Sequence, residues 1–424
     1  MAANNLEKLK TINVNSAWVK TIKGTNLSKV KLNIWVYRGT QGGVGIAGTE
    51  IALSGGRPTA PTYTLESTGV GAATDDFGIS ASQRIASFEI AGLVKDFIES
   101  SLDGRYNSNN TLWVDIQATT TTLGVDTILK AEQFLALDGY DYSIEEQDSE
   151  DLAILISNRN VVKSTDTPIH IPVLRDKLIS YAFQFEGVDI ANGVQTDFPS
   201  SNSSSQQITY LTNAEGTLEG FKERVLADQV GNIFEYNDCL TMLETTLDTF
   251  AVDRLYITYD SNTSDLSAVQ VPVTEIIYFE NLPCTRDDKR RLTFVNKYGA
   301  LQDVWFYGNS DRRSLNVTSD NWNRRNLTTG GGVYRPTKVK NNSRVNEMLT
   351  LNSGFYTEEN NVVFEELMQS NNVWLWTIPT DDSSSETYPV IIKNSTFNFK
   401  TSNTDKLINY TINLEFAFNK MRTL

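Results

Sequence analysis

Cysteine and histidine are almost missing from this chain of 424 residues. It contains two cysteines, Cys239 and Cys284, and one histidine, His170. Two cysteines are too few for a disulfide framework or a thiolate metal site, so we expect two buried free thiols, with a single disulfide as the alternative. One imidazole is also too few for a metal site built on histidine. The sequence therefore predicts no bound metal.

The residues needed for common catalytic sites are missing as well. His170 lies between two isoleucines and two prolines in the segment 168–172, which favours a strand-surface or interface histidine over a catalytic base. No G-x-S-x-G motif supplies a nucleophilic serine. Paired carboxylates such as Glu365 and Glu366 or Asp381 and Asp382 fall in polar contexts, which are typical of solvated surface. We expect no enzyme, and keep a glycosidase or an esterase as an alternative hypothesis.

Long apolar runs and nucleotide-binding motifs are also lacking. No run approaches the roughly 18 apolar residues that a membrane-spanning helix needs. The first residues, 1–7, do not show a basic stretch followed by an apolar one, so we expect no secretion signal and folding in a cytoplasm. The glycines of the segment 39–45 are not followed by the Lys-Ser or Lys-Thr of a phosphate loop. We expect no cofactor and no membrane partner.

Positive charge is scarce, and it is unevenly placed. The net charge is −15, from 52 acidic and 37 basic residues, which disfavours a general nucleic-acid binder. Residues 131–280 contain 26 acidic and 7 basic side chains, whereas residues 284–344 contain 13 basic and 5 acidic ones. Three interpretations remain open: a solvated surface of scattered sign, electrostatic complementarity between neighbouring copies of the chain, and contact with DNA.

Apolar and polar residues alternate with period two through much of the chain. Val30–Tyr37 and Tyr410–Phe418 show this pattern most clearly, and clusters of Gly, Asn, Ser and Asp separate such segments. Helical spacing occurs only in 91–102 and 358–369. The sequence predicts a mainly β protein with two or three β-sandwich or barrel-like domains and a few short amphipathic helices.

Polar, low-complexity stretches suggest the domain boundaries. An acidic run at 145–151 ends a first β-rich domain, 1–150, which holds one helix. The middle region, 151–268, is a β-rich domain or an insertion with long polar loops, and 269–424 forms a C-terminal β-rich domain with one helix.

Arginine pairs and tryptophans supply the candidate contact surfaces. Subunit interfaces are enriched in both residue types, and the seven tryptophans fall mostly on expected strands. Core packing accounts for such tryptophans as well, and an exposed aromatic face would suit a glycan. The residues that we predict at an interface are Arg290, Arg291, Arg312, Arg313, Arg324, Arg325, Trp374 and Trp376.

Three segments resemble a known protein family. The segment Arg291–Phe306, with the hairpin-like turn Lys297-Tyr298-Gly299, is similar to a motif of virion proteins of tailed bacteriophages, including the crAss-like group. Residues 87–98 and 389–418 resemble the N-terminal and C-terminal domains of that family. The resemblance covers both ends and leaves 150–270 unmatched. It implies a subunit of a tail barrel, collar or hub ring, and it brings no catalytic residues.

We therefore expect a non-enzymatic virion structural protein that forms an oligomeric ring or collar layer of a phage tail or neck. Its expected partners are other copies of itself in a cyclic homo-oligomer and other tail or portal-proximal proteins, with no specific nucleic acid. It would lie in the virion, after assembly in the host cytoplasm. A receptor-binding or glycan-binding tail module is the alternative.

Overall fold

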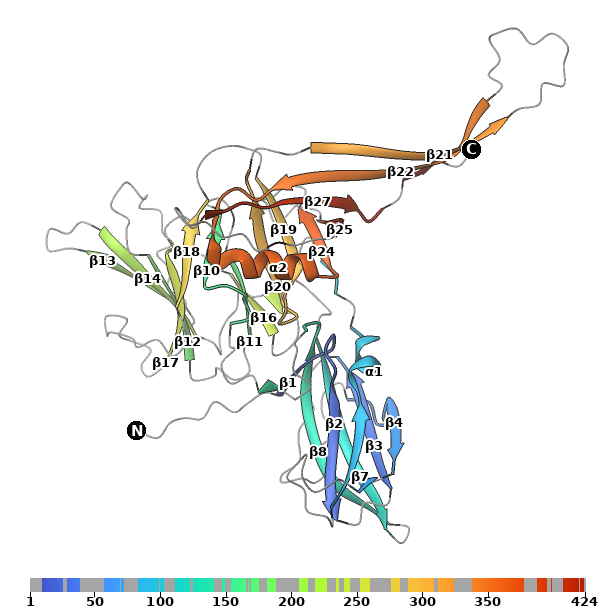
Figure 1. Cartoon of the computed structure of the whole chain (residues 1–424). Coiled ribbons are helices and arrows are strands. Elements are labelled where there is room, and N and C mark those ends of the chain that lie inside the picture. The colour runs from blue at the N-terminus through green and yellow to red at the C-terminus, as the bar shows by residue number, and fades with distance from the viewer. Residues whose placement is uncertain are drawn as a thin grey trace. The chain divides into compact units, whose positions relative to one another are not determined.

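The described part of the chain is mainly β, with two short α-helices, in a computed structural model (Figure 1). This confirms the predicted fold class. The structure describes residues 10–25, 29–38, 57–68, 70–71, 83–98, 100–102, 111–122, 125–140, 147–148, 154–164, 167, 169–174, 181–187, 206–212, 218–226, 234–235, 240–244, 252–259, 276–282, 289–308, 312–323, 338–376, 387–394, 398, 407–418 and 420–422.

The chain forms two compact units, and its path alternates between them. Unit 1 contains 1–282 and 295–303, and unit 2 contains 283–294 and 304–424. Both predicted domain boundaries, 150/151 and 268/269, lie outside the described residues. Unit 1 includes the middle region with residues 1–150, so a separate middle domain stays a prediction.

Unit 1 begins with a β-sandwich. Its larger sheet has six strands and its smaller sheet three, and helix α1 (Ala91–Lys95) follows β6. In spatial order the larger sheet consists of β4 (Tyr63–Ser67), β3 (Val30–Tyr37), β7 (Thr111–Thr122), β8 (Val125–Leu137), β1 (Lys10–Asn13) and β9 (Gln147–Asp148), and the smaller sheet of β2 (Val19–Thr25), β6 (Gln83–Glu89) and β5 (Val70–Gly71).

One hydrophobic core joins these two sheets and α1. The inward residues of β3, such as Val30 and Leu32, lie in the same cluster as Ile22 of β2, Phe88 of β6 and Val94 of α1. The alternation that predicted β3 has this cause, because every second side chain of a strand points to the same face. The predicted helix 91–102 is shorter than expected and ends at Lys95.

The middle region of unit 1 contains two further sheets. The first has the order β10 (Asn160–Lys163), β18 (Ile277–Asn281), β17 (Arg254–Tyr259), β12 (Tyr181–Gly187), β14 (Leu218–Leu226) and β13 (Gln206–Thr212). The second has the order β11 (His170–Leu174), β16 (Leu240–Glu244) and β15 (Phe234–Glu235). Strands β10 and β18 are parallel, and the other pairs of these two sheets are antiparallel.

The segment 295–303, which contains a tight turn between two strands, completes unit 1. It joins β19 (Arg290–Val295) to β20 (Leu301–Phe306), as the sequence predicted for this hairpin. The Asn296 side chain organises the turn: its Oδ1 accepts from the backbone N–H of Tyr298 and of Ala300, and its Nδ2 donates to the backbone oxygen of Leu155 at 2.8 Å. Gly299 has φ of +76°, a conformation that glycine adopts without a steric cost.

The main sheet of unit 2 has eight strands. α2 (Asn361–Gln369), preceded by a 3₁₀ turn at Glu358–Asn360, matches the predicted helix 358–369. A short pair, β23 (Tyr356–Thr357) and β26 (Leu407–Ile408), accompanies the sheet. The order of the main sheet is β20, β19, β24 (Val373–Trp376), β25 (Thr387–Ile392), β27 (Thr411–Phe416), β22 (Lys338–Asn352) and β21 (Arg312–Asn323), with β28 (Lys420–Arg422) on β22.

Aromatic side chains around α2 form the core of unit 2. The ring of Phe364 lies 5.2 Å from that of Tyr356 and 4.9 Å from that of Tyr410, and Phe306 packs edge-on to it. The hydroxyl of Tyr356 donates to the backbone oxygen of Trp305 at 2.6 Å, and burial raises the pKa of Tyr356 well above its ordinary range. These contacts fix α2 against β20 and β23.

Candidate interaction surface

His170 lies on β11, and its ring is buried. Its Nδ1 is 3.8 Å from Oδ2 of Asp303, another residue of unit 1. The prediction placed this histidine on a strand surface or at an interface, and its burial corrects that. A buried ring on a strand gives no access to a substrate, which a general base requires.

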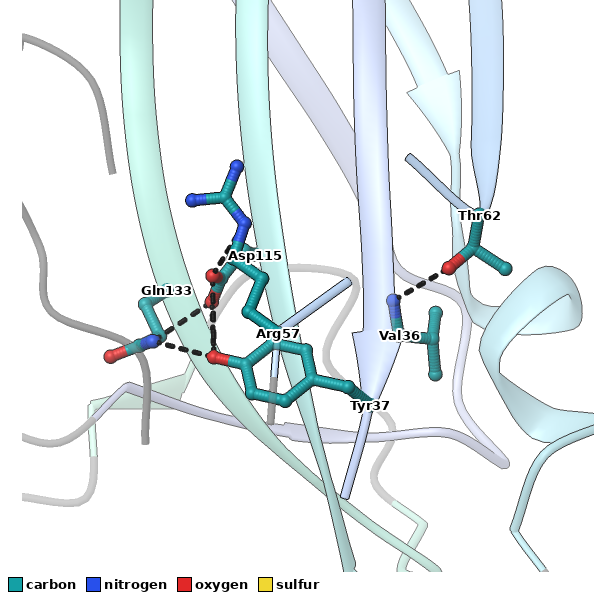
Figure 2. Close-up of polar contacts among 6 residues, drawn as sticks. All are labelled: Val36, Tyr37, Arg57, Thr62, Asp115 and Gln133. Carbon is teal, nitrogen blue, oxygen red and sulfur yellow. Dashed lines mark hydrogen bonds and ion pairs between the residues drawn. The ribbon is translucent and has the colours of Figure 1, made fainter. Parts of the chain in front are cut away.

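Asp115 is the centre of a buried polar network in the first sandwich (Figure 2). Trp35 of β3, Asp115 of β7 and Gln133 of β8 are direct cross-strand neighbours. Because Val114 and Ile116 belong to the hydrophobic core, Asp115 lies on the opposite face of the sheet.

Three side chains converge on the Asp115 carboxylate. The hydroxyl of Tyr37 lies 3.2 Å from both carboxylate oxygens, and Gln133 Nε2 donates to Oδ1 at 2.9 Å and to the Tyr37 hydroxyl at 3.0 Å. Arg57 Nε is 3.5 Å from Oδ2, and its guanidinium carbon lies 4.0 Å from the centre of the Trp35 ring. The segment that holds Arg57 is also fixed to β3, because Val36 N–H donates to the Thr62 hydroxyl (Figure 2).

Burial raises the pKa of Asp115 above its ordinary value near 3.8. Desolvation is the dominant cause, and the hydrogen bond from Gln133, the charge of Arg57 and the hydrogen bond from Tyr37 oppose it. Asp115 is 0% exposed, so no substrate reaches its carboxyl group in this structure. The network cross-links β3, β7, β8 and the segment at Arg57, and we assign it a structural role.

Three of the residues predicted at an interface are instead inside unit 2. Arg291 and Trp376 are 0% exposed, and Trp374 is also buried. The Arg291 guanidinium stacks on the Trp376 ring at 3.5 Å from its centre, and Trp376 Nε1 donates to the Thr293 hydroxyl at 2.7 Å. These side chains therefore form no surface for another subunit, which corrects the prediction.

The cause of this difference is the position of β24 in the sheet. It lies between β19 and β25, and all four of its side chains are buried. A central strand that is covered on both faces has no outward side, so its alternation does not separate surface from core. Arg291, on the neighbouring strand β19, is tolerated in this core because stacking on Trp376 stabilises its desolvated guanidinium.

The remaining predicted interface residues lie elsewhere. Arg290 is partly exposed at the start of β19. Arg312 and Arg313 open strand β21. Arg324 and Arg325 lie outside the described residues. The structure thus brings two of the eight predicted residues to one long strand that the sequence did not identify.

That strand belongs to a two-stranded arm, which we define as 312–323 of β21 and 338–347 of β22. Strand β22 pairs with β27 only through Met348–Asn352, whereas its pairing with β21 continues back to Lys338. Figure 1 shows this ribbon running on beyond the strands with which it forms the sheet. β28 joins the arm only at Ser343–Val345. At 3.3 Å per residue, β21 is about 40 Å long.

The arm exposes apolar side chains on a sheet edge. Leu315, Val317 and Trp322 are 59%, 48% and 58% exposed. Among the described strands, β21 is the last in its sheet and pairs with β22 alone. A long edge strand with exposed apolar side chains is a template for pairing with another chain. Of the surfaces that the structure describes, this one has the clearest features of an interface.

The described part of the chain offers neither a metal cluster nor a membrane-spanning helix. No group of three or more His, Cys, Asp or Glu side chains there is arranged to hold a metal ion. None of the described helices is long and apolar enough to cross a membrane.

Comparison with known proteins adds no relative. No protein-family model matches the chain, and no curated protein matches it significantly.

Proposed function

We propose that this chain is a non-enzymatic structural subunit that works through its interfaces, as one copy in an oligomeric ring or collar layer of a phage tail or neck. The observation that carries the proposal is the arm: a β21 edge with three exposed apolar side chains, Leu315, Val317 and Trp322. Exposed apolar side chains on an edge strand favour aggregation unless a specific partner covers them. A subunit that is always assembled has such a partner.

Two observations from the sequence support the phage part of the proposal. The segment Arg291–Phe306 resembles a motif of tailed-phage virion proteins, and it forms the hairpin β19–β20 that its own alternation and turn residues predicted. The segregation of acidic and basic residues along the chain fits subunits that recognise one another by charge. The proposed partners are other copies of the chain and other tail or portal-proximal proteins, in the virion.

The alternative of a glycan-binding tail module has less support. Trp374 and Trp376, the aromatic pair that the sequence offered for a glycan platform, are buried in the core of unit 2. Trp322 is exposed, but it lies on the arm next to basic residues and is not part of a described aromatic face. A glycan array would detect binding if this alternative holds.

Particles of the virus that encodes the chain provide the test. We expect the protein in purified virions, in a constant number of copies per particle, and antibody-labelled images should place it at the tail or neck. Absence from virions, together with a monomeric purified protein, would exclude the proposal. Turnover of a cell-wall or capsule polysaccharide that one carboxylate substitution abolishes would replace it with the enzyme hypothesis.

A further inference from the structure

We propose that Lys20 and Glu132 form an intramolecular isopeptide bond, an amide between the two side chains that ties together the two sheets of the first sandwich. The inference is independent of the proposed function, because it concerns a covalent modification inside unit 1. Three features of this pair of residues carry it: its place between the sheets, its burial, and a third charged side chain that contacts the carboxylate.

The two side chains come from different sheets and point into the same core. Lys20 lies on β2, two residues before Ile22. Glu132 lies on β8, two residues before Phe134. Ile22 and Phe134 belong to the hydrophobic core, and alternate side chains of a strand share a face, so Lys20 and Glu132 also point between the sheets. There Lys20 Nζ contacts Glu132 Oε2.

Apolar side chains surround this buried pair. The side chains of Lys20 and Glu132 are 4% and 9% exposed. Lys20 Nζ lies 5.2 Å from the centre of the Phe134 ring, and Trp18 packs edge-on against that ring. Two opposite charges in such surroundings carry a desolvation cost comparable with their mutual attraction. An amide carries no charge, so condensation removes this cost, and the exclusion of water from the core protects the amide from hydrolysis.

Other lysine–glutamate pairs of the chain lack this setting. Lys29 Nζ is 2.7 Å from Glu66 Oε2, and Lys393 Nζ is 2.9 Å from Glu415 Oε2. The two lysine side chains are 55% and 46% exposed, so water hydrates their charges and little is gained by removing them. These two pairs therefore serve as internal controls, in which we expect no amide.

The condensation balances without a further reactant. The Lys20 ammonium gives up a proton, the freed lone pair of Nζ attacks Cδ of Glu132, a C–N bond forms, and the bond from Cδ to Oε1 breaks. Of the three ammonium protons, one stays on the amide nitrogen and two leave with Oε1 as water, while Oε2 remains as the amide oxygen. The fold supplies the proximity, since well-oriented intramolecular reactions reach effective molarities of roughly 10⁵ to 10⁸ M.

Lys130 is the charged side chain that contacts the leaving oxygen. It lies two residues before Glu132 on β8, so the two side chains share a face of the strand. Lys130 Nζ is 2.8 Å from Glu132 Oε1. Its ammonium stabilises the negative charge that develops on this oxygen as the C–O bond breaks. This contact makes Lys130 a catalytic residue of the condensation.

Mass spectrometry of the purified full chain tests the bond directly. We expect an intact mass that is lower by one water molecule than the sequence gives, and a branched peptide after digestion that joins the segment of Lys20 to that of Glu132. The double variant Lys20→Met/Glu132→Gln removes both charges at similar side-chain volume, and its mass should equal that of its sequence. Peptides that contain Lys29 and Glu66 should be recovered unlinked from the wild type.

The rate of bond formation tests the role of Lys130. In pulse-labelled protein sampled after synthesis, Lys130→Met should slow the appearance of the branched peptide roughly tenfold or more, because the developing charge loses its stabilising ammonium. Lys130→Arg, which keeps the charge, should restore most of the rate. Lys29→Met is the control at an exposed lysine and should leave the rate unchanged. A wild-type rate in Lys130→Met would contradict its catalytic role.

Two results would overturn the isopeptide bond itself. The first is a wild-type mass equal to that of the sequence, with Lys20 and Glu132 recovered in separate peptides, which would leave the two residues as an ordinary buried ion pair. The second is a loss of water that persists in Lys20→Met/Glu132→Gln, which would place the dehydration elsewhere in the chain.

Discussion

At the scale of single residues, Gly299 is a position whose backbone does not accommodate a side chain. Its φ of +76° is one that L side chains rarely adopt, and a Cβ there would lie 2.6 Å from the backbone nitrogens of Asp138 and Gly139. Neither contact can be relieved by moving a flexible side chain. The turn of the β19–β20 hairpin therefore requires glycine for two independent reasons.

Gly299→Ala should lower the free energy of unfolding by roughly 2 kcal/mol or more, since left-handed strain adds to a backbone clash. Gly92→Ala is the control, because Gly92 lies in α1 and a Cβ added there would meet no atom within 4 Å. Alanine there should leave stability unchanged or raise it by up to about 1 kcal/mol. Urea denaturation followed by tryptophan fluorescence measures both variants. Equal changes in the free energy of unfolding for the two variants would contradict the requirement for glycine at position 299.

Asp115 gives the fold a defined pH dependence. Its pKa is raised in the folded state above an ordinary value near 3.8, so the folded state holds this proton more tightly than the unfolded state does. The stability that protonated Asp115 contributes to the folded state is fully present below pH 3.8. It is lost as the pH rises through the pKa of Asp115 in the folded state.

The wild type should therefore lose stability relative to Asp115→Asn as the pH rises from about 3.8. Asparagine keeps the size of the side chain and removes the ionisation, and the other titrating groups cancel in the comparison. Denaturation of both proteins across acidic to neutral pH gives the difference. A difference that stays constant with pH would show that Asp115 does not titrate as described.

The sequence could not have identified the Asp115 network. Asp115, Gln133 and Tyr37 come together only because β3, β7 and β8 pair in one register, and that register depends on the whole sandwich. The alternation of residues along a strand does not determine which strand pairs with it, or which residue of that strand lies opposite each of its own.

At the scale of elements, strands with one buried face were predictable and the arm was not. The C-terminal alternation holds in β27, where Ile412 and Leu414 are buried and Thr411 and Asn413 are exposed. β21 has the sequence RRSLNVTSDNWN, and each of its side chains that the structure describes is exposed. The apolar alternation of β21 is limited to Leu315 and Val317, so its residues gave only a weak strand signal.

The exposure of the arm also predicts how it responds to truncation of its side chains. Leu315→Ala should change the free energy of unfolding by less than about 0.5 kcal/mol, as for most surface substitutions. Leu349→Ala, on the partner strand and 7% exposed, should cost roughly 2 to 5 kcal/mol. Thermal or urea unfolding compares the two. A large cost for Leu315→Ala would mean that this side chain serves the fold of its own chain.

At the scale of the whole molecule, the chain passes between its two units three times, at 282/283, 294/295 and 303/304. The segment 295–303 belongs to unit 1, although the strands that flank it continue into unit 2. Within unit 1 it receives a hydrogen bond from Tyr140 N–H to the Lys297 oxygen at 2.8 Å, and the Gln302 amide oxygen accepts from the Ser157 hydroxyl at 2.9 Å. A cut of the sequence at 282 would remove these contacts from unit 1.

Asn296→Ala should reveal this division in the full chain. The substitution removes the acceptor of two turn N–H groups and the donor to Leu155, and loss of each buried hydrogen bond costs roughly 1 to 3 kcal/mol. Amide hydrogen exchange should become roughly tenfold faster or more in 154–157 of unit 1 and stay unchanged in α2 of unit 2. Asn321→Ala, exposed on β21, is the control and should change neither region. If amide exchange in α2 became faster by the same factor, the assignment of 295–303 to unit 1 would be contradicted.

The interface residues were predicted less well than the fold. Arginine and tryptophan mark interfaces and also mark cores, and sequence alone does not separate the two when a strand is covered on both faces, as β24 is. The charge segregation along the chain was visible in the sequence. The structure adds that Arg312 and Arg313 lie on β21 and Lys338 and Lys340 on its partner strand β22.

The mass of the purified protein in solution tests the central claim, that this chain functions as a subunit. One chain has a mass of 47.4 kDa. Sedimentation or light scattering over a range of concentrations should give a defined multiple of that mass, and images of the same sample should show a closed ring with cyclic symmetry. A single species of 47.4 kDa at every concentration, from protein that virions do not contain, would contradict the account.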